Sequence, residues 1–480
     1  MIRSGICLVT VLVLLVSLCA VLPGARAEGG FSVKPVKDVV SFDSNTLRVE
    51  APEAGHLTVI FGDKFGDYRH LSADVPAGTS EIPWDGLADD GQKLGIFNNL
   101  YTLRATLLTG GGAEETFTTT FQLARPLQTL LFALPSAPVL YLGGAPARDR
   151  WFVEMQAVRL NEHTRIQMQV CRADDPDTVV TTRAIAIKSE EAFKYYWDGT
   201  NAKTRKPLPA GDYVLTFWMD ANPDYRHTFP VTLAEGAMPT PPVEETGEIM
   251  PRADMTDEEL WTLMMQPSVV VDITDRHHQP VYASPSTRSA SLGDLHGQSQ
   301  CLEVLAVEDN WARVSAWVHD SNELVEGYVP LSRLKVVQPQ GPYGVLVDKR
   351  AQTLTLFENG RRMTTLSVST GLPTQAHPER ETTPGCFLTS ERIGNFATDR
   401  RHYFYVIRYD GGNLIHSIGF QTVNQRADFR EQWDLLGQKA SHGCIRVPSR
   451  PTNESGVDAW WLYTHLPYHT RVLVLDDTAD

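Results

Sequence analysis

An internal repeat is the sequence feature that most constrains how this chain can fold. The first copy carries Trp84-Asp85-Gly86, and Tyr101 follows 17 positions after the tryptophan. The second copy carries Trp197-Asp198-Gly199, and Tyr213 follows 16 positions after its tryptophan. Around these motifs apolar and polar residues alternate, which is typical of strands that bury one face. We therefore predict two similar all-β domains in this part of the chain.

The repeat resembles the Ig-like β-sandwich of the flagellar hook-capping protein. This resemblance implies two Ig-like domains, at residues 28–125 and 126–235, that serve as spacers or docking surfaces. We expect Trp84 and Trp197 in the domain cores, because aromatic side chains are more often core residues than exposed platforms. The alternative is a sugar-binding aromatic surface.

The N-terminal segment has the form of a secretory signal peptide. An apolar run from Ile6 to Leu22 follows Arg3, and Ala25-Arg26-Ala27 provides the small residues of a cleavage site. We predict that residues 1–27 are removed on export and that the rest faces the periplasm or the cell wall. Because the apolar run is long for a signal peptide, an uncleaved membrane anchor is the alternative.

The overall charge limits the possible partners. The chain carries a formal net charge of −15 at pH 7. Such an acidic protein is poorly suited to bind nucleic acid or to adhere electrostatically to an anionic envelope. We expect no nucleic-acid partner, and any attachment to a wall has to be specific.

Residues 236–267 are rich in Pro, Glu, Thr and Gly, which predicts a linker. A brief helix is expected at its end, from Asp257 to Met265, because the acidic first turn suits the helix dipole. The short strands and turns of residues 268–338 follow. Trp311 and the later Gly327-Tyr328-Val329-Pro330 resemble bacterial SH3-like domains, which often bind wall components. A packing module that covers the next domain is the alternative.

The pair His277-His278 invites interpretation as a metal site. Adjacent residues of a strand point to opposite faces, however, and no ligand cluster of Asp, Glu or Cys lies near in the sequence. We therefore expect no metal ion.

The stretch from Ser441 to Val447 carries the strongest chemical signal. Cys444 follows His442 and Gly443 and precedes Arg446, an arrangement that suits an attacking thiolate beside an anion site. Gly443 allows a tight turn whose N–H groups could hold an oxyanion. Because an ordinary thiol is mostly protonated at neutral pH, a base is needed, and His416 is the candidate.

This stretch, together with Leu414-Ile415-His416-Ser417 and Thr383-Pro384-Gly385, resembles the active-site signature of the L,D-transpeptidase (YkuD-like) family. The resemblance covers residues 342–477. It implies Cys444 as the nucleophile, His416 as the base, and a Ser417 carbonyl that orients this histidine. It further implies that Arg446 binds a substrate carboxylate and that Ser441 and His442 shape the substrate site. His442 is the alternative base because it is nearest in sequence.

One departure from the family concerns the interval between His416 and Cys444. It spans 28 positions, which is longer than is usual in that family. Phe429, Trp433 and Leu436 recur at helical spacing, and a glycine suited to a C-terminal cap follows. We interpret the extra residues as a short helix inserted beside the cleft.

The cysteines have a simple interpretation. Of the six in the chain, Cys171, Cys301, Cys386 and Cys444 lie outside the leader. A disulfide between Cys386 and Cys444 would silence the nucleophile, and the other two lie in separate domains. We predict no structural disulfide, with the three other cysteines as small buried apolar residues.

The sequence thus predicts a mainly β, multidomain protein: two Ig-like β-sandwiches, a small SH3-like barrel and a C-terminal YkuD-like catalytic domain. The resemblance implies acyl transfer between two peptidoglycan stem peptides, a donor and an amine acceptor, without a cofactor. The SH3-like and Ig-like domains could contact other wall polymers. A hydrolase of wall peptides, acting as an L,D-carboxypeptidase, uses the same residues. A non-catalytic wall-binding scaffold is the alternative from a different class.

Overall fold

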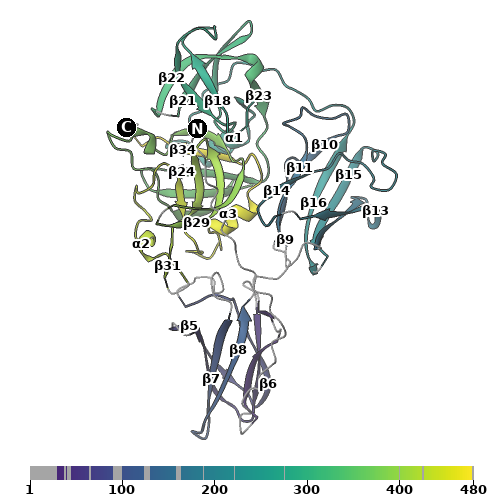
Figure 1. Cartoon of the computed structure of the whole chain (residues 1–480), viewed down its shortest axis with the longest axis vertical. Helices are drawn as coiled ribbons and strands as arrows, with labels where there is room; N and C mark the ends of the chain where they lie inside the picture. Colours follow the sequence, from purple (N-terminus) through teal and green to yellow (C-terminus); the bar gives the residue numbers. More distant parts are fainter. Residues whose placement is uncertain are drawn as a thin grey trace, which may run out of the picture. The chain divides into compact units, whose positions relative to one another are not determined.

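The computed structural model describes residues 30–477, with gaps at 37–38, 41–44, 64–65, 90–99, 124–129, 158–163, 188, 221, 275, 320, 399 and 424–425. The predicted signal peptide lies outside these residues. Two compact units divide the chain: residues 1–90 with 99–123, and residues 91–98 with 124–480. Strands predominate in both, which confirms the mainly β prediction (Figure 1). None of the helices in the described ranges is long and apolar enough to cross a bilayer.

The first unit consists of two sheets. The smaller has the strand order β1-β3-β6 and the larger β2-β8-β7-β4-β5. Their bounds are β1 Ser32–Pro35, β2 Val39–Val40, β3 Asn45–Ala51, β4 Gly55–Asp63, β5 Gly66–Val75, β6 Gly78–Trp84, β7 Leu100–Thr109 and β8 Glu114–Leu123.

Aromatic side chains join the two sheets of this unit. Trp84, at the end of β6, is 3% exposed and stacks on Phe61 of β4 with ring centroids 4.3 Å apart. Tyr101 and Phe121 complete the cluster from the larger sheet. The predicted packing role of Trp84 is confirmed, because its ring is buried between the sheets.

The second unit begins with eight strands that repeat this topology. Its sheets have the orders β14-β11-β9 and β10-β16-β15-β12-β13, so each strand takes the place of the one numbered eight lower in the first unit. Trp197 is likewise 3% exposed and lies in the core. This agreement supports the internal repeat. The bounds are β9 Leu130–Pro135, β10 Val139–Tyr141, β11 Phe152–Ala157, β12 Arg165–Arg172, β13 Asp175–Ala186, β14 Phe193–Tyr196, β15 Gly211–Met219 and β16 Asn222–Ala234.

The helix α1 spans Asp257–Met265, the same residues for which the sequence predicts a helix. Thr256 caps it, because its side chain accepts the N–H of Glu259 while the Glu259 carboxylate accepts the N–H of Thr256. A five-stranded sheet, β19-β18-β22-β21-β20, and the pair β17-β23 follow. Their bounds are β17 Ser268–Val271, β18 His278–Tyr282, β19 Ser291–His296, β20 Glu303–Glu308, β21 Trp311–Val318, β22 Glu323–Pro330, η1 Leu331–Arg333 and β23 Leu334–Val337.

The C-terminal part contains the sheets β26-β25-β24-β34-β27 and β28-β29-β30-β33, with a small hairpin β31-β32. Apolar side chains from both larger sheets and from α3 form one core. The bounds are β24 Tyr343–Asp348, β25 Thr353–Glu358, β26 Arg361–Ser367, η2 Pro378–Arg380, β27 Gly385–Leu388, β28 Arg392–Ala397, β29 His402–Asp410, β30 Asn413–Ser417, β31 Gln421–Val423, β32 Arg426–Asp428, α2 Arg430–Trp433, β33 Ile445–Val447, α3 Ala459–His465 and β34 Arg471–Leu475.

A buried ion pair joins β11 of the second eight-stranded domain to β28. The carboxylate of Glu154 accepts Nη1 of Arg392, and the two side chains are 3% and 1% exposed. Nε of Arg392 also donates to the carbonyl of Tyr463 at 2.7 Å, and Nη2 donates to the carbonyl of Leu466 at the end of α3. The ring of Phe132 on β9 packs edge-on against Tyr463. The second domain therefore supports helix α3, which packs against β29 and β30.

We predict that Glu154→Gln lowers the free energy of unfolding by about 3–5 kcal/mol, because it leaves the buried guanidinium without a counter-charge. Urea unfolding of the full chain measures the change. Glu248→Gln, which breaks the exposed pair with Arg252, is the matched control and should cost under about 1 kcal/mol. Equal effects of the two substitutions would contradict the prediction.

Candidate active site

The candidate site is built on two neighbouring parallel strands. In the pairing of β30 with β33, Ile415 lies opposite Ile445 and His416 lies opposite Arg446. The two isoleucines are buried in the core between the sheets. Since side chains alternate along a strand, His416, Arg446 and the preceding Cys444 share the other face. Residues far apart in the sequence thus meet at one place.

Cys444 lies immediately before β33 and is partly exposed. Burial raises the pKa of its thiol, although an N–H from Leu414 and the charge of Arg446 act in the opposite direction. The net shift is upward. Cys444 is therefore a protonated thiol at neutral pH, and its attack on a carbonyl requires a base.

His416 is 2% exposed, and its Nδ1 lies 2.6 Å from the carbonyl oxygen of Ser417. Because a carbonyl only accepts, Nδ1 carries the proton and Nε2 is left as an acceptor. Tyr403 and Phe396 pack edge-on against the ring, at 4.9 and 5.4 Å between centroids. Burial lowers the pKa of His416 to about 4, and the Arg446 charge acts in the same direction. The imidazole is thus neutral at pH 7, as a general base must be.

The loop before Cys444 turns at Gly443, which has a φ of +108°. A Cβ at this position would lie 2.2 Å from the side-chain oxygen of Asn413 and 2.9 Å from the carbonyl oxygen of Glu381. No larger residue fits without moving the backbone. Glycine is therefore required here both by conformation and by space.

Three hydrogen bonds fix this loop. Thr382 donates from Oγ1 to the carbonyl of Gly443 at 2.8 Å, and Ser441 donates from Oγ to the carbonyl of Cys444 at 2.5 Å. The N–H of Gly443 donates to Ser441 Oγ at 3.2 Å. We predict the N–H groups of Gly443 and Cys444 for an oxyanion, and that of Gly443 is thus engaged within the loop. A charged oxyanion would be the stronger acceptor.

Sequence reasoning missed Thr382, which hydrogen-bonds the loop, and Asn413, whose side chain lies close to Gly443. Thr382 directly precedes the Thr-Pro-Gly motif that the sequence analysis singled out, and Asn413 directly precedes the Leu-Ile-His-Ser motif. Their positions next to recognised motifs were the only sequence signal that could have pointed to them. Their contacts with Gly443 depend on the fold.

The long segment between β30 and β33 also reaches the site. Nη1 of Arg446 donates to the side chain of Gln432 on α2 at 3.1 Å and to the carbonyl of Ala440 at 3.0 Å. Phe429, Ile418 and their neighbours form a small apolar cluster that holds the segment. Helix α2 is shorter than the predicted helix. The insertion thus supplies a residue, Gln432, that orients the candidate carboxylate-binding arginine.

His442 occupies a different environment from His416. Its side chain is exposed, and burial and the charges of Arg380 and Arg446 lower its pKa. His442 is therefore uncharged at neutral pH, and Arg446 supplies the positive charge near Cys444, which suits an anionic ligand.

The residues described here contain no group of three or more His, Cys, Asp or Glu arranged to hold a metal ion. His278, one of the two histidines that suggested a metal, stacks face to face on His296 with ring centroids 3.7 Å apart.

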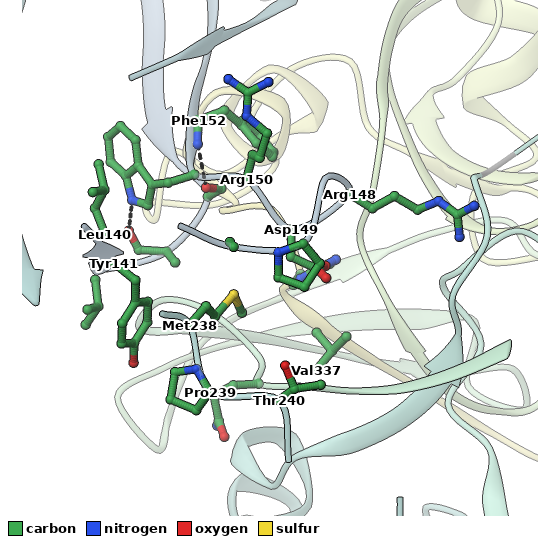
Figure 2. Close-up of a pocket in the computed structure, with 18 of the residues that line it drawn as sticks. Leu140, Tyr141, Arg148, Asp149, Arg150, Phe152, Met238, Pro239, Thr240 and Val337 are labelled. Carbon is green, nitrogen blue, oxygen red and sulfur yellow. Dashed lines mark hydrogen bonds between the residues drawn. The ribbon is translucent and has the colours of Figure 1, made fainter. Parts of the chain in front are cut away.

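A cavity of about 380 Å³ lies elsewhere, beside β10, the linker and β23 (Figure 2). Figure 2 shows Tyr141, Met238 and Pro239 among the residues around it. Polar groups of its lining pair with one another, as in the contact of Lys335 with Asp149 at 2.6 Å. None of the predicted site residues lines it.

Comparison with known families identifies the domain that carries this site. Residues 342–474 match the model of the YkuD family, the L,D-transpeptidase catalytic domain. This match confirms the resemblance that the sequence motifs indicate for the C-terminal part of the chain and supports an enzyme of the L,D-transpeptidase class. It does not extend to the Ig-like and SH3-like assignments, which stay predictions.

Individual relatives are distant. YciB of Bacillus subtilis (strain 168) is 28% identical over 134 residues, which are 27% of this chain and 63% of that protein. The L,D-transpeptidase of Xylanimonas cellulosilytica DSM 15894 (residues 123–326) is 21% identical, with 29% of this chain and 62% of that one covered and a TM-score of 0.20. L,D-transpeptidase 1 of Mycobacterium tuberculosis is 16% identical, and the match covers 42% of this chain and 100% of that one with a TM-score of 0.22. The chain thus spans less than two thirds of the first two relatives, and the structural likeness carries no argument at these scores.

We predict that Thr382→Val slows alkylation of Cys444 by iodoacetamide about tenfold or more. The substitution removes the hydroxyl that donates to the Gly443 carbonyl and accepts the N–H of Gly371. Each of these two buried backbone groups then lacks a partner, which costs about 1–3 kcal/mol of stability. Site-resolved mass spectrometry measures the rate. Thr355→Val, a buried threonine on β25 that bonds Thr365, is the control. A rate within about twofold of wild type in Thr382→Val would contradict the proposed support.

The pKa directions of Cys444 and His416 predict a particular pH profile. A thiol with a raised pKa on the same face as a neutral imidazole forms no thiolate–imidazolium pair at rest. The alkylation rate of Cys444 should therefore rise roughly tenfold per pH unit through the neutral range, as the thiolate fraction does. A rate that is already independent of pH near neutrality would show a preformed ion pair and contradict this account.

Proposed function

We propose that this protein is an exported cysteine L,D-transpeptidase that acts on peptidoglycan stem peptides. The observation that carries the proposal is the common face of β30 and β33, where Cys444, His416 and Arg446 project together in a domain that matches the L,D-transpeptidase family. The partners are a donor stem and an amine acceptor. Export accords with the predicted signal peptide.

The first half-reaction forms a thioester. Nε2 of His416 takes the thiol proton as Cys444 Sγ attacks the carbonyl of the third residue of a tetrapeptide stem. The N–H groups of Cys444 and Gly443 stabilise the oxyanion, and Gly443 gives up its long contact with Ser441 to do so. The peptide bond then breaks, D-alanine leaves with the proton from His416, and the acyl group remains on sulfur.

The second half-reaction resolves the thioester. The amine of a second stem, or of another wall-linked acceptor, attacks the acyl carbon and gives up a proton to His416. The new amide bond forms as Cys444 leaves as thiolate and regains that proton. If water takes the place of the amine, the same residues act as an L,D-carboxypeptidase. The two activities differ only in acceptor access.

Arg446 is proposed to bind a carboxylate of the donor stem. Guanidinium groups suit this task because their planar donors match the two carboxylate oxygens. Gln432 and the Ala440 carbonyl hold one end of the guanidinium, which fixes its direction. Partial burial makes the charge more effective than it would be in water.

We predict that the full chain, incubated with a purified disaccharide tetrapeptide, yields dimers that lack one D-alanine. Mass spectrometry of muropeptides and of the protein follows products and the Cys444 thioester, and a carbapenem-type β-lactam should acylate the same sulfur. Cys444→Ala should abolish both reactions, whereas Cys171→Ala, a buried cysteine outside the domain, should retain them.

The other outcomes have definite meanings. Tripeptide without dimers would assign the carboxypeptidase activity instead. Retained turnover in Cys444→Ala would disprove the mechanism. If the intact protein formed neither adduct nor product, the non-catalytic scaffold would replace the enzyme as the explanation.

A further inference from the structure

Within the described residues, one buried arginine outside the candidate active site has no carboxylate partner. Arg471, the first residue of β34, is 0% exposed. Its Nε and Nη2 donate to the carbonyls of Met264 and Gln266 at the end of α1, at 3.3 and 2.6 Å. Among the ion pairs of the described part of the chain, none includes Arg471. A buried charge is costly unless an opposite charge compensates it.

Two cysteine sulfurs contact this guanidinium. Nη1 of Arg471 lies 2.7 Å from Sγ of Cys301 and 2.9 Å from Sγ of Cys386. From the sequence, both cysteines are predicted to be small buried apolar residues. They are buried, at 5% and 2% exposure, but an apolar role does not account for their contact with a cation. Among the described residues, they are the ionisable side chains that hydrogen-bond to Arg471.

The backbone brings the two cysteines directly opposite each other. Gln300 and Phe387 form an antiparallel bridge, and next to it the N–H of Cys301 donates to the carbonyl of Cys386 at 2.9 Å. Opposed residues at such a position have Cα atoms about 5.5 Å apart, within the range that a disulfide spans. Their side chains point to the same side of the strands, where both meet Arg471.

The electrostatics separate the two thiols. Burial opposes the ionisation of Cys301, but a hydrogen bond from Cys386 and the charge of Arg471 outweigh it and lower its pKa to about 6. Burial and the neighbouring Cys301 raise the pKa of Cys386 well above its ordinary value. These opposite pKa shifts favour a state in which Cys386 keeps its proton and Cys301 carries a negative charge. A thiolate there would lie in direct contact with Arg471 and compensate its charge.

We propose that Cys301 and Cys386 form a redox pair, which neutralises Arg471 as a thiolate when reduced and closes to a disulfide when oxidised. The disulfide would join residues 268–337 covalently to the catalytic domain. This inference is independent of the proposed transpeptidase activity, because neither cysteine belongs to the site around Cys444.

The oxidant is an external disulfide, either a small molecule or an oxidoreductase. The Cys301 thiolate attacks one sulfur of that disulfide, its S–S bond breaks, and one external thiolate leaves. Cys386 then loses its proton to solvent and attacks Cys301 Sγ, which forms the Cys301–Cys386 bond and releases the second external thiol. Two protein thiols are oxidised and one external disulfide is reduced. Since both sulfurs are buried, the exchange requires local opening or takes place before the two segments pack.

The pair lies close in sequence to the supports of the catalytic loop. Cys386 follows Thr382 by four positions, and Thr382 holds the Gly443 carbonyl. Thr383 donates to the side chain of Asn322, in the turn between β21 and β22, at 3.0 Å. A disulfide would therefore fix the same interface that supports the loop of Cys444.

The test is a redox titration of the full chain carrying Cys444→Ala, in buffers with different ratios of reduced to oxidised glutathione. Equilibrium is reached both from the reduced and from the oxidised protein. After an acid quench and alkylation in denaturant, peptide mass spectrometry should find a single two-electron transition with a Cys301–Cys386 cross-linked peptide. Cys171 should stay alkylated throughout. Alkylation of both Cys301 and Cys386 in the most oxidising buffer, or only mixed disulfides with glutathione, would overturn the redox pair.

A second measurement tests the role of Arg471. Arg471→Gln removes the stabiliser of the reduced form, so the disulfide should form in buffers at least about tenfold more reducing. Should that variant fail to fold, the ultraviolet absorbance of the thiolate serves instead. In the reduced Cys444→Ala protein it should titrate near pH 6, the step should disappear in Cys301→Ala, and it should remain in Cys171→Ala. Absence of the step would overturn the counter-ion role.

Discussion

Parallel pairing of β30 with β33 is the constraint on which the candidate site depends. In a parallel strand pair, residues that lie opposite each other point to the same face. The register that places His416 opposite Arg446 therefore brings the side chains of the candidate site together. A shift by one residue would turn Cys444 and Arg446 into the core and Ile445 out of it. The hydrophobic face that buries Ile415 and Ile445 therefore fixes the catalytic geometry. The same strand register thus sets both the packing of the core and the positions of the candidate site residues.

The environment of this face decides the protonation states. Burial disfavours the charged form of both groups, so it raises the pKa of the Cys444 thiol and lowers that of His416. Both groups are therefore neutral at rest, and in the proposed mechanism the proton moves when a substrate carbonyl is in place. Arg446 contributes the positive charge nearby, held by Gln432 from the inserted segment. The long interval between the two motifs thus has a structural use beside the site.

Local patterns were predictable from the sequence and contacts between distant residues were not. The helix from Asp257 to Met265 follows from its capping residues and acidic first turn, and the repeated strand topology follows from the Trp-Asp-Gly repeat. Cys444, His416 and Arg446 stand in motifs, which made them recognisable. The support of Gly443 by Thr382 joins residues 61 positions apart. The contact of Arg471 with Cys301 spans 170 positions, and no periodicity or spacing signals it.

In the proposed mechanism His416, rather than His442, activates Cys444. Acylation of Cys444 by a carbapenem at neutral pH, followed by mass spectrometry in His416→Gln and His442→Gln, tests it most directly. We expect a fall of about 10²–10⁴-fold in His416→Gln, the usual contribution of a general base, and a rate within a few-fold of wild type in His442→Gln. The reverse order would contradict the assignment and make the exposed His442 the base.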